Sequence, residues 1–276
     1  MVRDPPDSPR VILGRRAVLV LGAAGMLATG CGEEEPVSRR PEEIVPYGDD
    51  LAQYAELHRP AGESRGVVVV IHGGFWKAQY DAALGRPLAI SLAEEGWTAW
   101  NLEYRRVGNG GGVPRTLDDV SAGIDALADV DGLDTSRVIA LGHSAGGHLA
   151  TWAAGRADAG VRVTHVISQA GVLDLVEADR LGLGGGAVQA FLGHPPGPDD
   201  AKYDPQQQIP LEVPIWCVHG RADSTVPFSQ SEGYVEAATA AGARAELVPV
   251  DGDHFVVIDP TDPAWERQLR ILDEIT

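Results

Sequence analysis

Cysteine is scarce in this chain of 276 residues, which holds only Cys31 and Cys217. Two cysteines cannot form the set of disulfides that stabilises small secreted domains. Cys217 lies in an apolar run, where a small core residue is expected rather than a reactive thiol. No Cys/His cluster has the spacing of metal ligands, so no metal site is expected, and no motif calls for an organic cofactor.

Basic residues are also in short supply. The 22 Lys and Arg residues against 40 Asp and Glu residues give a formal net charge of -18 at pH 7. Such a charge disfavours nucleic acid as a partner and favours solubility. Aromatic residues make up 6% of a chain that is 44% hydrophobic, an ordinary composition for a globular protein. The length suits one large α/β domain, and the sequence leaves the oligomeric state open.

The longest apolar stretch near the N-terminus, residues 17–27, is too short for an ordinary transmembrane helix, which needs about 20 apolar residues. It follows Arg15-Arg16 and precedes small residues that end at Cys31, the pattern of a secretory signal over residues 1–30. The segment resembles a twin-arginine signal and a bacterial lipobox. We therefore expect an exported protein anchored to a membrane by a lipid on Cys31; the alternative is a plainly cleaved signal with an incidental cysteine.

Residues 31–45 are charged and contain prolines, and are expected to form a flexible tether ahead of a folded domain at 46–276. Within that domain, apolar runs that predict strands alternate with helical patterns, which indicates a mostly parallel central sheet flanked by helices. Strands are predicted within residues 47–58, 67–71, 97–104, 138–141, 162–169, 213–218 and 247–250. Helices are predicted at 81–95, 116–130 with Thr116 as the cap, 147–154, 187–192 and 263–275. Residues 170–210, rich in Gly, Pro and Asp, are expected to form a cap-like insertion.

Ser144 lies in a Gly-x-Ser-x-Gly motif between a buried strand and a helix. The apolar run at 138–141 precedes Gly142, and a helix of small and apolar residues follows Gly146. This is the context of a nucleophile elbow, in which flanking glycines let two backbones pass closely while the serine projects from a strained turn. The pentapeptide alone proves little in a chain with 34 glycines, so the rest of the site must support it.

An acid and a base follow in the order that a parallel sheet requires. Asp223 lies after the strand predicted at 213–218, and His254 lies after the strand predicted at 247–250. Asp223 is expected to orient the imidazole of His254, which would deprotonate Ser144 and then protonate the leaving group.

Other acidic and imidazole groups lie close to these two in sequence. Asp251 and Asp253 are alternatives for the acid, but they lie so near His254 that they are expected to shape its loop instead. His143 and His219 flank the site and could support its reacting residues, and His143 is also a candidate for the substrate pocket.

A second motif, His72-Gly73-Gly74-Phe75-Trp76, follows the strand at 67–71. Backbone amides on such a loop can face a developing oxyanion, and the amides of Gly74, Phe75 and Ala145 are the expected donors. His72 and Gly73 are expected to support this loop rather than react. Trp76 is a further candidate for the substrate pocket.

With these residues placed, the chain from about Gly66 to Phe255 resembles the α/β-hydrolase superfamily. More narrowly it resembles esterases with this oxyanion loop, a group that includes kynurenine formamidases, feruloyl and acetyl-xylan esterases, and hormone-sensitive-lipase-like carboxylesterases. Phe75-Trp76 stands where the last of these carry a third glycine. The segments that carry the resemblance are His72–Trp76, Asn101–Arg105 with Asp119, Gly142–Ala150, and His219–Pro227 with Gly252–Phe255.

The resemblance implies a serine hydrolase that cleaves small acyl or aryl esters through an acyl-enzyme. An arylformamidase and a serine peptidase of the prolyl-oligopeptidase type use the same triad and stay open as alternatives. A hydrolase fold without activity, used only for binding, is the non-enzymatic alternative.

Overall fold

The computed structural model describes residues 41–275. The predicted signal segment, the lipidation site at Cys31 and most of the predicted tether lie outside these residues. Within them, no helix combines the length and the apolar composition that crossing a bilayer requires.

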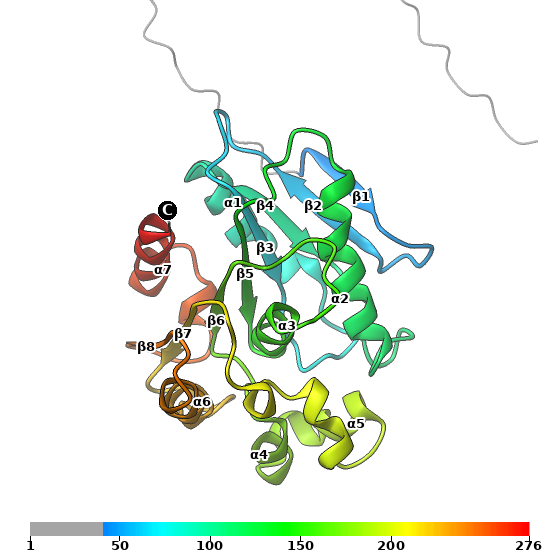
Figure 1. Ribbon diagram of the computed structural model, residues 1–276, viewed down its shortest axis with the longest axis vertical. Coiled ribbons are helices and arrows are strands. Elements are labelled where there is room, and N and C mark those ends of the chain that lie inside the picture. Colours follow the sequence, from blue (N-terminus) through cyan, green and yellow to red (C-terminus); the bar gives the residue numbers. More distant parts are fainter. Residues whose placement is uncertain (1–40, 276) are drawn as a thin grey trace, which may run out of the picture. The chain divides into compact units, whose positions relative to one another are not determined.

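An eight-stranded sheet in the order β1-β2-β4-β3-β5-β6-β7-β8 forms the centre of the fold (Figure 1). The six strands from β3 to β8 are parallel, whereas β2 runs antiparallel to β4 and β1 antiparallel to β2. The sheet is therefore mostly parallel, as predicted. The strands are β1 Glu43–Pro46, β2 Tyr54–His58, β3 Val67–Ile71, β4 Thr98–Leu102, β5 Val138–His143, β6 His165–Gln169, β7 Ile215–Gly220 and β8 Ala245–Val250. Residues 43–45 were predicted to belong to a flexible tether, but they form the edge strand because they pair antiparallel with β2.

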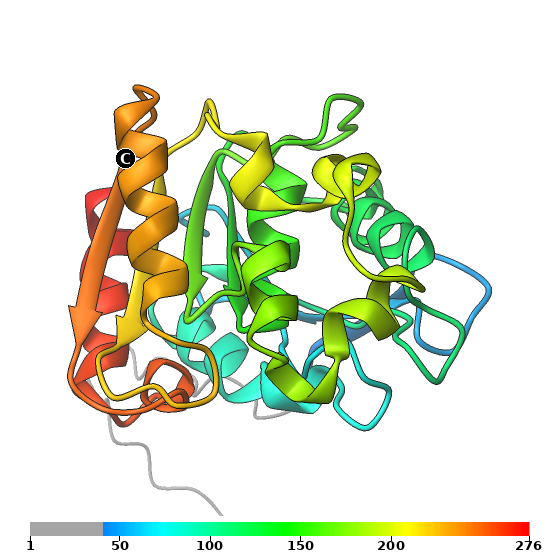
Figure 2. The ribbon, with the colours of Figure 1, turned by 90° about the horizontal axis from the view of Figure 1, so that it is seen from below.

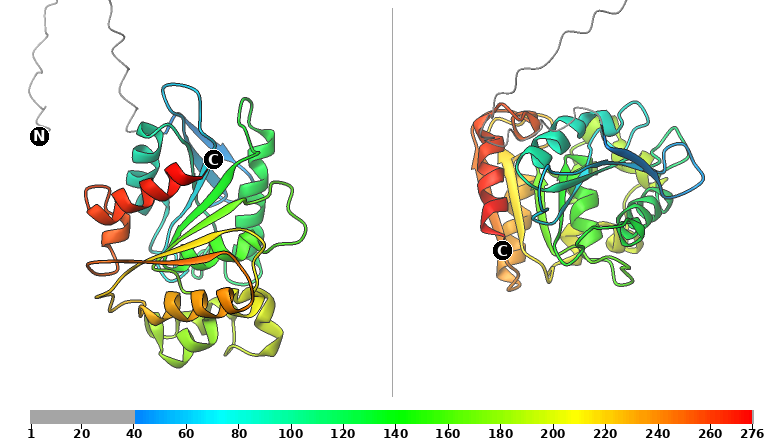
Figure 3. Two further views of the ribbon diagram at one scale, coloured as in Figure 1. Left: turned by 60° about the vertical axis from the view of Figure 1, so that its left-hand side comes forward. Right: turned by 90° about the horizontal axis from the view of Figure 1, so that it is seen from above.

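Helices cover both faces of the sheet (Figure 3). Helices α1 (Arg86–Glu94) and α7 (Pro263–Glu274) pack on one face, and α2 (Arg115–Asp125), α3 (Ala145–Ala154) and α6 (Ser229–Ala240) pack on the other. Short 3₁₀ helices lie in the connections: η1 Ala82–Leu84, η2 Ala126–Asp129 and η6 Val256–Ile258.

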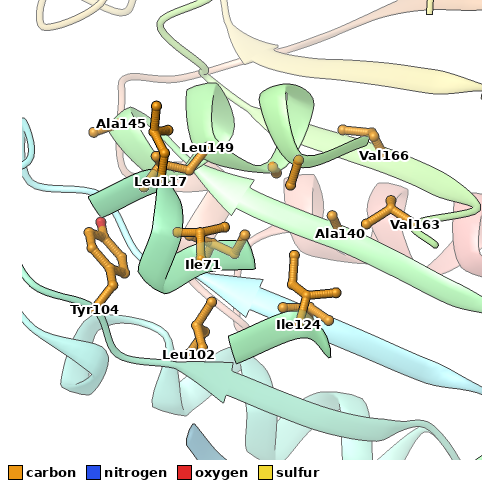
Figure 4. Close-up of a cluster of buried hydrophobic side chains, with 14 of the residues drawn as sticks. Ile71, Leu102, Tyr104, Leu117, Ile124, Ala140, Ala145, Leu149, Val163 and Val166 are labelled. Atoms are coloured by element: carbon orange, nitrogen blue, oxygen red, sulfur yellow. The ribbon is translucent and has the colours of Figure 1, made fainter. Parts of the chain in front are cut away.

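Two hydrophobic clusters, one on each face of the sheet, form the core. Along β3, Val67 and Val69 contribute to the cluster under α2 and α3, while Val68 and Val70 contribute to the cluster under α1 and α7. This alternation explains why the strand is apolar at every position. Figure 4 shows part of the first cluster between the sheet and α2. Cys217 on β7 is fully buried, and burial raises the pKa of its thiol, so it is a core residue as predicted.

The segment between β6 and β7 contains only short helices, α4 (Leu175–Arg180) and α5 (Ala187–Leu192) with η3 (Leu183–Gly185), η4 (Pro198–Tyr203) and η5 (Pro205–Gln208). They lie beside α3 in Figure 2, and we call residues 170–214 the cap segment. Five of its glycines have positive φ, a conformation that favours glycine because the Cβ atom of any other residue makes it sterically costly. They are Gly182, Gly184, Gly185, Gly186 and Gly193.

One prediction about helices was wrong, and one helix was missed. Thr116 does not cap α2, because the helix begins one residue earlier and the Thr116 hydroxyl accepts a bond from the Gly112 N–H and donates to the Arg105 carbonyl. Helix α6 was not predicted at all. Its buried face includes Gln230 and Ser231, so it carries no regular apolar period.

Candidate active site

The carboxyl ends of β3, β5, β7 and β8 bring the predicted site together. Because these strands are parallel, the loops that follow them lie along the same edge of the sheet. His72–Trp76 follows β3, Ser144 follows β5, Asp223 follows β7 and His254 follows β8.

Ser144 lies on a sharp turn between β5 and α3, with φ 57° and ψ -119°. Its backbone N–H donates to the Gln169 carbonyl at 2.8 Å, which ties the turn to the end of β6. A Cβ on Gly142 would lie 2.1 Å from the Gly146 carbonyl oxygen, and one on Gly146 would lie 2.0 Å from the Ile71 carbonyl oxygen. Only glycine therefore fits on either side of the serine, which is the geometry of a nucleophile elbow.

Asp223 and His254 form the acid–base pair. His254 Nδ1 donates to Asp223 Oδ2 at 2.6 Å, and the N–H groups of Thr225 and Val226 donate to Oδ1 at 2.8 and 2.9 Å. Burial raises the pKa of a carboxyl, yet the hydrogen bonds that this one accepts hold the pKa of Asp223 well below its ordinary value. The ionised carboxylate fixes the proton of His254 on Nδ1, which leaves Nε2 free to act as a base.

Within residues 41–275, neither of the two alternative acids forms a hydrogen bond with the imidazole of the base. Asp253 accepts the Phe255 N–H at 2.9 Å and so shapes the loop, as expected, and Asp251 is exposed. The loops of the acid and the base touch directly, since a Cβ on Gly220 would lie 2.4 Å from the Asp253 carbonyl oxygen.

His143 supports the base from the strand below it. Its Nε2 donates to the His254 carbonyl oxygen at 3.0 Å, and the two rings lie 4.5 Å apart. Burial, with the neighbouring His254, lowers the pKa of His143 to about 3, so the ring is neutral at pH 7. His143 is only 6% exposed. The structure places it beneath His254, where it also borders a small cavity beside His72 and Gly73, and its place in the substrate pocket stays a prediction.

The loop after β3 holds three consecutive residues at positive φ: Gly74 (106°), Phe75 (52°) and Trp76 (55°). A Cβ on Gly73 would lie 2.9 Å from the Cβ of Ser144, so this loop lies directly against the elbow. Within residues 41–275, the N–H groups of Gly74, Phe75 and Ala145 have no hydrogen-bond partner. These are the donors predicted for an oxyanion.

His72 braces this loop. Its Nδ1 donates to the Gly73 carbonyl at 2.9 Å, and its Nε2 accepts from Arg106 at 3.1 Å. Tyr104 stacks on the imidazole with ring centroids 4.4 Å apart and donates its hydroxyl to the His72 carbonyl at 2.7 Å. A buried ion pair between Arg106 and Glu103 completes the support. Both ring nitrogens of His72 are therefore engaged in hydrogen bonds within the protein, which agrees with a supporting role rather than a reactive one.

Trp76 does not line a pocket. Its side chain is fully buried, stacks on Phe191 of α5 at 4.6 Å and meets the edge of His148 at 5.2 Å. The prediction of Trp76 as a pocket residue was therefore wrong, because the chain turns this side chain into the core. Phe75 is only partly buried and packs against Gly184 of the cap segment, where a Cβ would lie 2.7 Å from its ring.

Several supporting residues were not foreseen from the sequence. Lys77 Nζ donates to the Gly184 carbonyl at 2.7 Å and joins the oxyanion loop to the cap segment. Phe191 completes the stack on Trp76. His219 was expected to flank the site and to be able to support its reacting residues, and it does contact Asp223 directly, with its Nε2 3.1 Å from Oδ2. No local motif marks these roles, since each depends on a partner elsewhere in the chain.

No group of three or more His, Cys, Asp or Glu side chains in the described part of the chain could hold a metal ion. The arrangement at the edge of the sheet instead joins a strained serine, an acid–base pair and unpaired amides. Such a set can carry out nucleophilic acyl transfer.

Comparison with known proteins places this geometry among esterases. The BD-FAE family model matches residues 56–237. The chain is 27% identical over 265 residues to isoprenylcysteine alpha-carbonyl methylesterase of Arabidopsis thaliana, which covers 86% of this chain and 62% of that protein. It spans about three fifths of the length of the curated plant relatives that it matches.

Solved structures show the same fold. A truncated carbohydrate esterase from gut microbiota superposes with a TM-score of 0.76 at 19% identity, over 88% of this chain and 98% of that one. Esterase Est2 of Thermogutta terrifontis with bound butyrate has a TM-score of 0.69 at 25% identity, over 86% of this chain and 94% of that one. The predicted fold, a mostly parallel sheet flanked by helices as in α/β-hydrolases, is confirmed.

Proposed function

The chain belongs to the BD-FAE family of α/β-hydrolase esterases, and from this premise we propose that it is a serine hydrolase that cleaves carboxylic esters through an acyl-enzyme. Ser144 Oγ attacks the ester carbonyl while His254 Nε2 takes the hydroxyl proton. The C–O bond to the alcohol then breaks, and His254 returns the proton to the departing alcohol oxygen. Water repeats the sequence on the acyl-enzyme and releases the acid.

The observation that carries this proposal is the pairing of Asp223 with His254 on the loops beside the elbow. The 2.6 Å bond sets the tautomer that a general base needs, and the carboxylate stabilises the imidazolium that forms. The amides of Gly74, Phe75 and Ala145 supply donors for the oxyanion, and losing one such donor costs about 3–4 kcal/mol of transition-state stabilisation.

The test is hydrolysis of p-nitrophenyl acetate together with labelling by a fluorophosphonate probe. A related structure supports the choice of probe, because Est2 of Thermogutta terrifontis, 25% identical, has also been solved phosphonylated by sarin. We expect the purified protein to show both signals and Ser144→Ala to lose both. Ser229→Ala, an exposed serine on α6, is the matched control and should retain them. Absence of both signals from the unmodified protein would contradict the proposal and leave the binding-protein alternative.

The substrate is a small acyl or aryl ester, by analogy with the named esterases. The curated plant relatives are methylesterases, and the gut structure is a carbohydrate esterase. A panel of acetylated sugars, feruloyl esters, short acyl esters, N-formylkynurenine and a prolyl peptide would separate the esterase from the arylformamidase and peptidase alternatives. Faster turnover of the formamide or the peptide than of every ester would overturn the ester assignment.

We further propose that the protein is exported and anchored by a lipid on Cys31. The support is the sequence alone, namely the basic pair Arg15-Arg16, the short apolar stretch and the small residues before the cysteine. Cys31→Ser should move the protein from the membrane fraction to the soluble fraction. Unchanged fractionation would contradict the anchor without bearing on the activity.

A further inference from the structure

His219, at the end of β7, makes a set of contacts that the mechanism above does not use. Its Nε2 lies 3.1 Å from Asp223 Oδ2 and 3.0 Å from the Val226 carbonyl oxygen. Its Nδ1 lies 2.7 Å from the hydroxyl of Ser231 on α6. The imidazole is fully buried, so water does not compete for these bonds.

These contacts determine where the proton of His219 lies. Two oxygen acceptors face Nε2, so this nitrogen must carry the proton, because an unprotonated nitrogen would repel both. Nδ1 of the neutral ring is then an acceptor, and Ser231 donates its hydroxyl to it. The serine on α6 therefore fixes the tautomer of an imidazole on β7.

The tautomer of His219 affects Asp223, the acid of the triad. Asp223 Oδ2 accepts one N–H from His254 at 2.6 Å and a second from His219 at 3.1 Å. A second donor on the same oxygen draws electron density from it and weakens its hold on the His254 proton. Without that donor, the carboxylate would stabilise the imidazolium of His254 more strongly, and the base would stay protonated to a higher pH.

We infer that His219, held in one tautomer by Ser231, is a positioning residue that tunes Asp223 and so sets the pH at which His254 becomes an active base. The inference rests on the proposed esterase function. Two further imidazoles interact with Asp223, His254 from the loop after β8 and His143 from β5. His143 stays neutral above about pH 3, so it adds no changing charge in the working range. Besides Asp223 itself, the charged groups on the loops after β7 and β8 are Arg221, Asp251 and Asp253.

The pH profile of kcat/KM for p-nitrophenyl acetate tests this inference, because its acid limb reports the ionisation of the base in the free enzyme. His219→Met removes the donor with little change in volume, and we expect the midpoint of the acid limb to rise by about half to one pH unit. His219→Gln can place an amide N–H near the position of Nε2 and should restore the midpoint. Ser231→Ala removes the hydroxyl that fixes the tautomer of His219, and it should raise the midpoint by less than His219→Met does.

A merely structural role would lower the fraction of active enzyme, measured by stoichiometric fluorophosphonate labelling, and leave the midpoint unchanged. That result in His219→Met and Ser231→Ala would overturn the inference. If His219→Met fails to fold, the midpoint of the acid limb in Ser231→Ala tests the inference by itself. Ser229→Ala on the same helix is then its control. An unmodified protein without any labelling would instead refute the proposed function, so the two failures are distinguishable.

Discussion

At the scale of single residues, strained backbone conformations are concentrated at the candidate active site. Within residues 41–275, the non-glycine residues with positive φ are Phe75, Trp76, Ser144 and Ala170, and each follows the carboxyl end of a strand in the sheet. The left-handed conformation costs a non-glycine residue about 1–2 kcal/mol. Packing elsewhere must offset this cost, and the close approach of Gly73 to the elbow, which leaves no room for a Cβ, is part of that packing.

Gly73→Ala is expected to damage catalysis far more than stability. The added Cβ would lie 2.7 Å from the His143 carbonyl oxygen and 2.9 Å from the Cβ of Ser144, so the oxyanion loop must move away from the nucleophile. We expect kcat/KM to fall by about 100-fold or more, as when an oxyanion donor is lost. Gly62→Ala, where a Cβ meets nothing within 4 Å, is the control. Equal kcat/KM values in the two variants would contradict the proposed loop geometry.

His148 is expected to make stability depend on pH. Burial lowers its pKa from 6.5 to about 4, so between these values the unfolded chain binds a proton that the folded chain does not. The stabilisation is therefore complete above pH 6.5 and is lost as the pH falls, by at most about 1.4 kcal/mol per pH unit. His148→Gln removes the titration and should flatten the slope of the free energy of unfolding between pH 6.5 and 4, measured with urea.

At the scale of elements, the oxyanion loop and the cap segment support one another. Trp76 stacks on Phe191 of α5, and Lys77 donates to the carbonyl of Gly184. Helix α3 joins them, since Nε2 of His148 donates to the Tyr203 carbonyl at 2.7 Å. The cap segment therefore holds the loop that is proposed to bind the oxyanion.

Phe191→Leu tests this coupling. The substitution keeps an apolar side chain but loses the aromatic stack on Trp76, so we expect a loss of about 1.5 kcal/mol in the free energy of unfolding. The rate of fluorophosphonate labelling of Ser144 should fall as well, because the loop loses its support. Val176→Ala, a half-exposed position on α4 of the same segment, should change neither quantity. Labelling at the normal rate in Phe191→Leu would show that the loop holds its shape without the stack on Trp76.

At the scale of the whole molecule, the two hydrophobic clusters share one sheet. Leu92 of α1 and Leu149 of α3 belong to opposite faces, yet alternate residues of the same strands contact both. Leu92→Ala is expected to lower the free energy of unfolding by about 2–5 kcal/mol. Because the sheet couples the faces, tryptophan fluorescence and circular dichroism should still report one transition. Two separate transitions would contradict a single cooperative domain, and Leu51→Ala, 96% exposed, should leave the midpoint unchanged.

Sequence predicted the features that depend on local pattern. Val67–Ile71 was apolar throughout and forms a central strand, and Ser144 stood between glycines that the close approach of two backbones requires. Features that depend on distant partners were missed. Trp76 faces the core because Phe191 lies 115 positions later in the chain, and α6 has a buried face with polar residues held by contacts outside the helix.

The glycine-rich turn of the cap segment has a consequence for directed evolution. A Cβ added to Gly182, Gly185 or Gly186 would meet nothing within 4 Å, so there is space for a side chain at each position. What disfavours other residues there is the positive φ of the backbone. Asparagine tolerates that conformation better than other residues. A library rich in Asn at these three codons should therefore yield many folded variants near the oxyanion loop. Gly184, pressed against Phe75, should be kept constant in such a library.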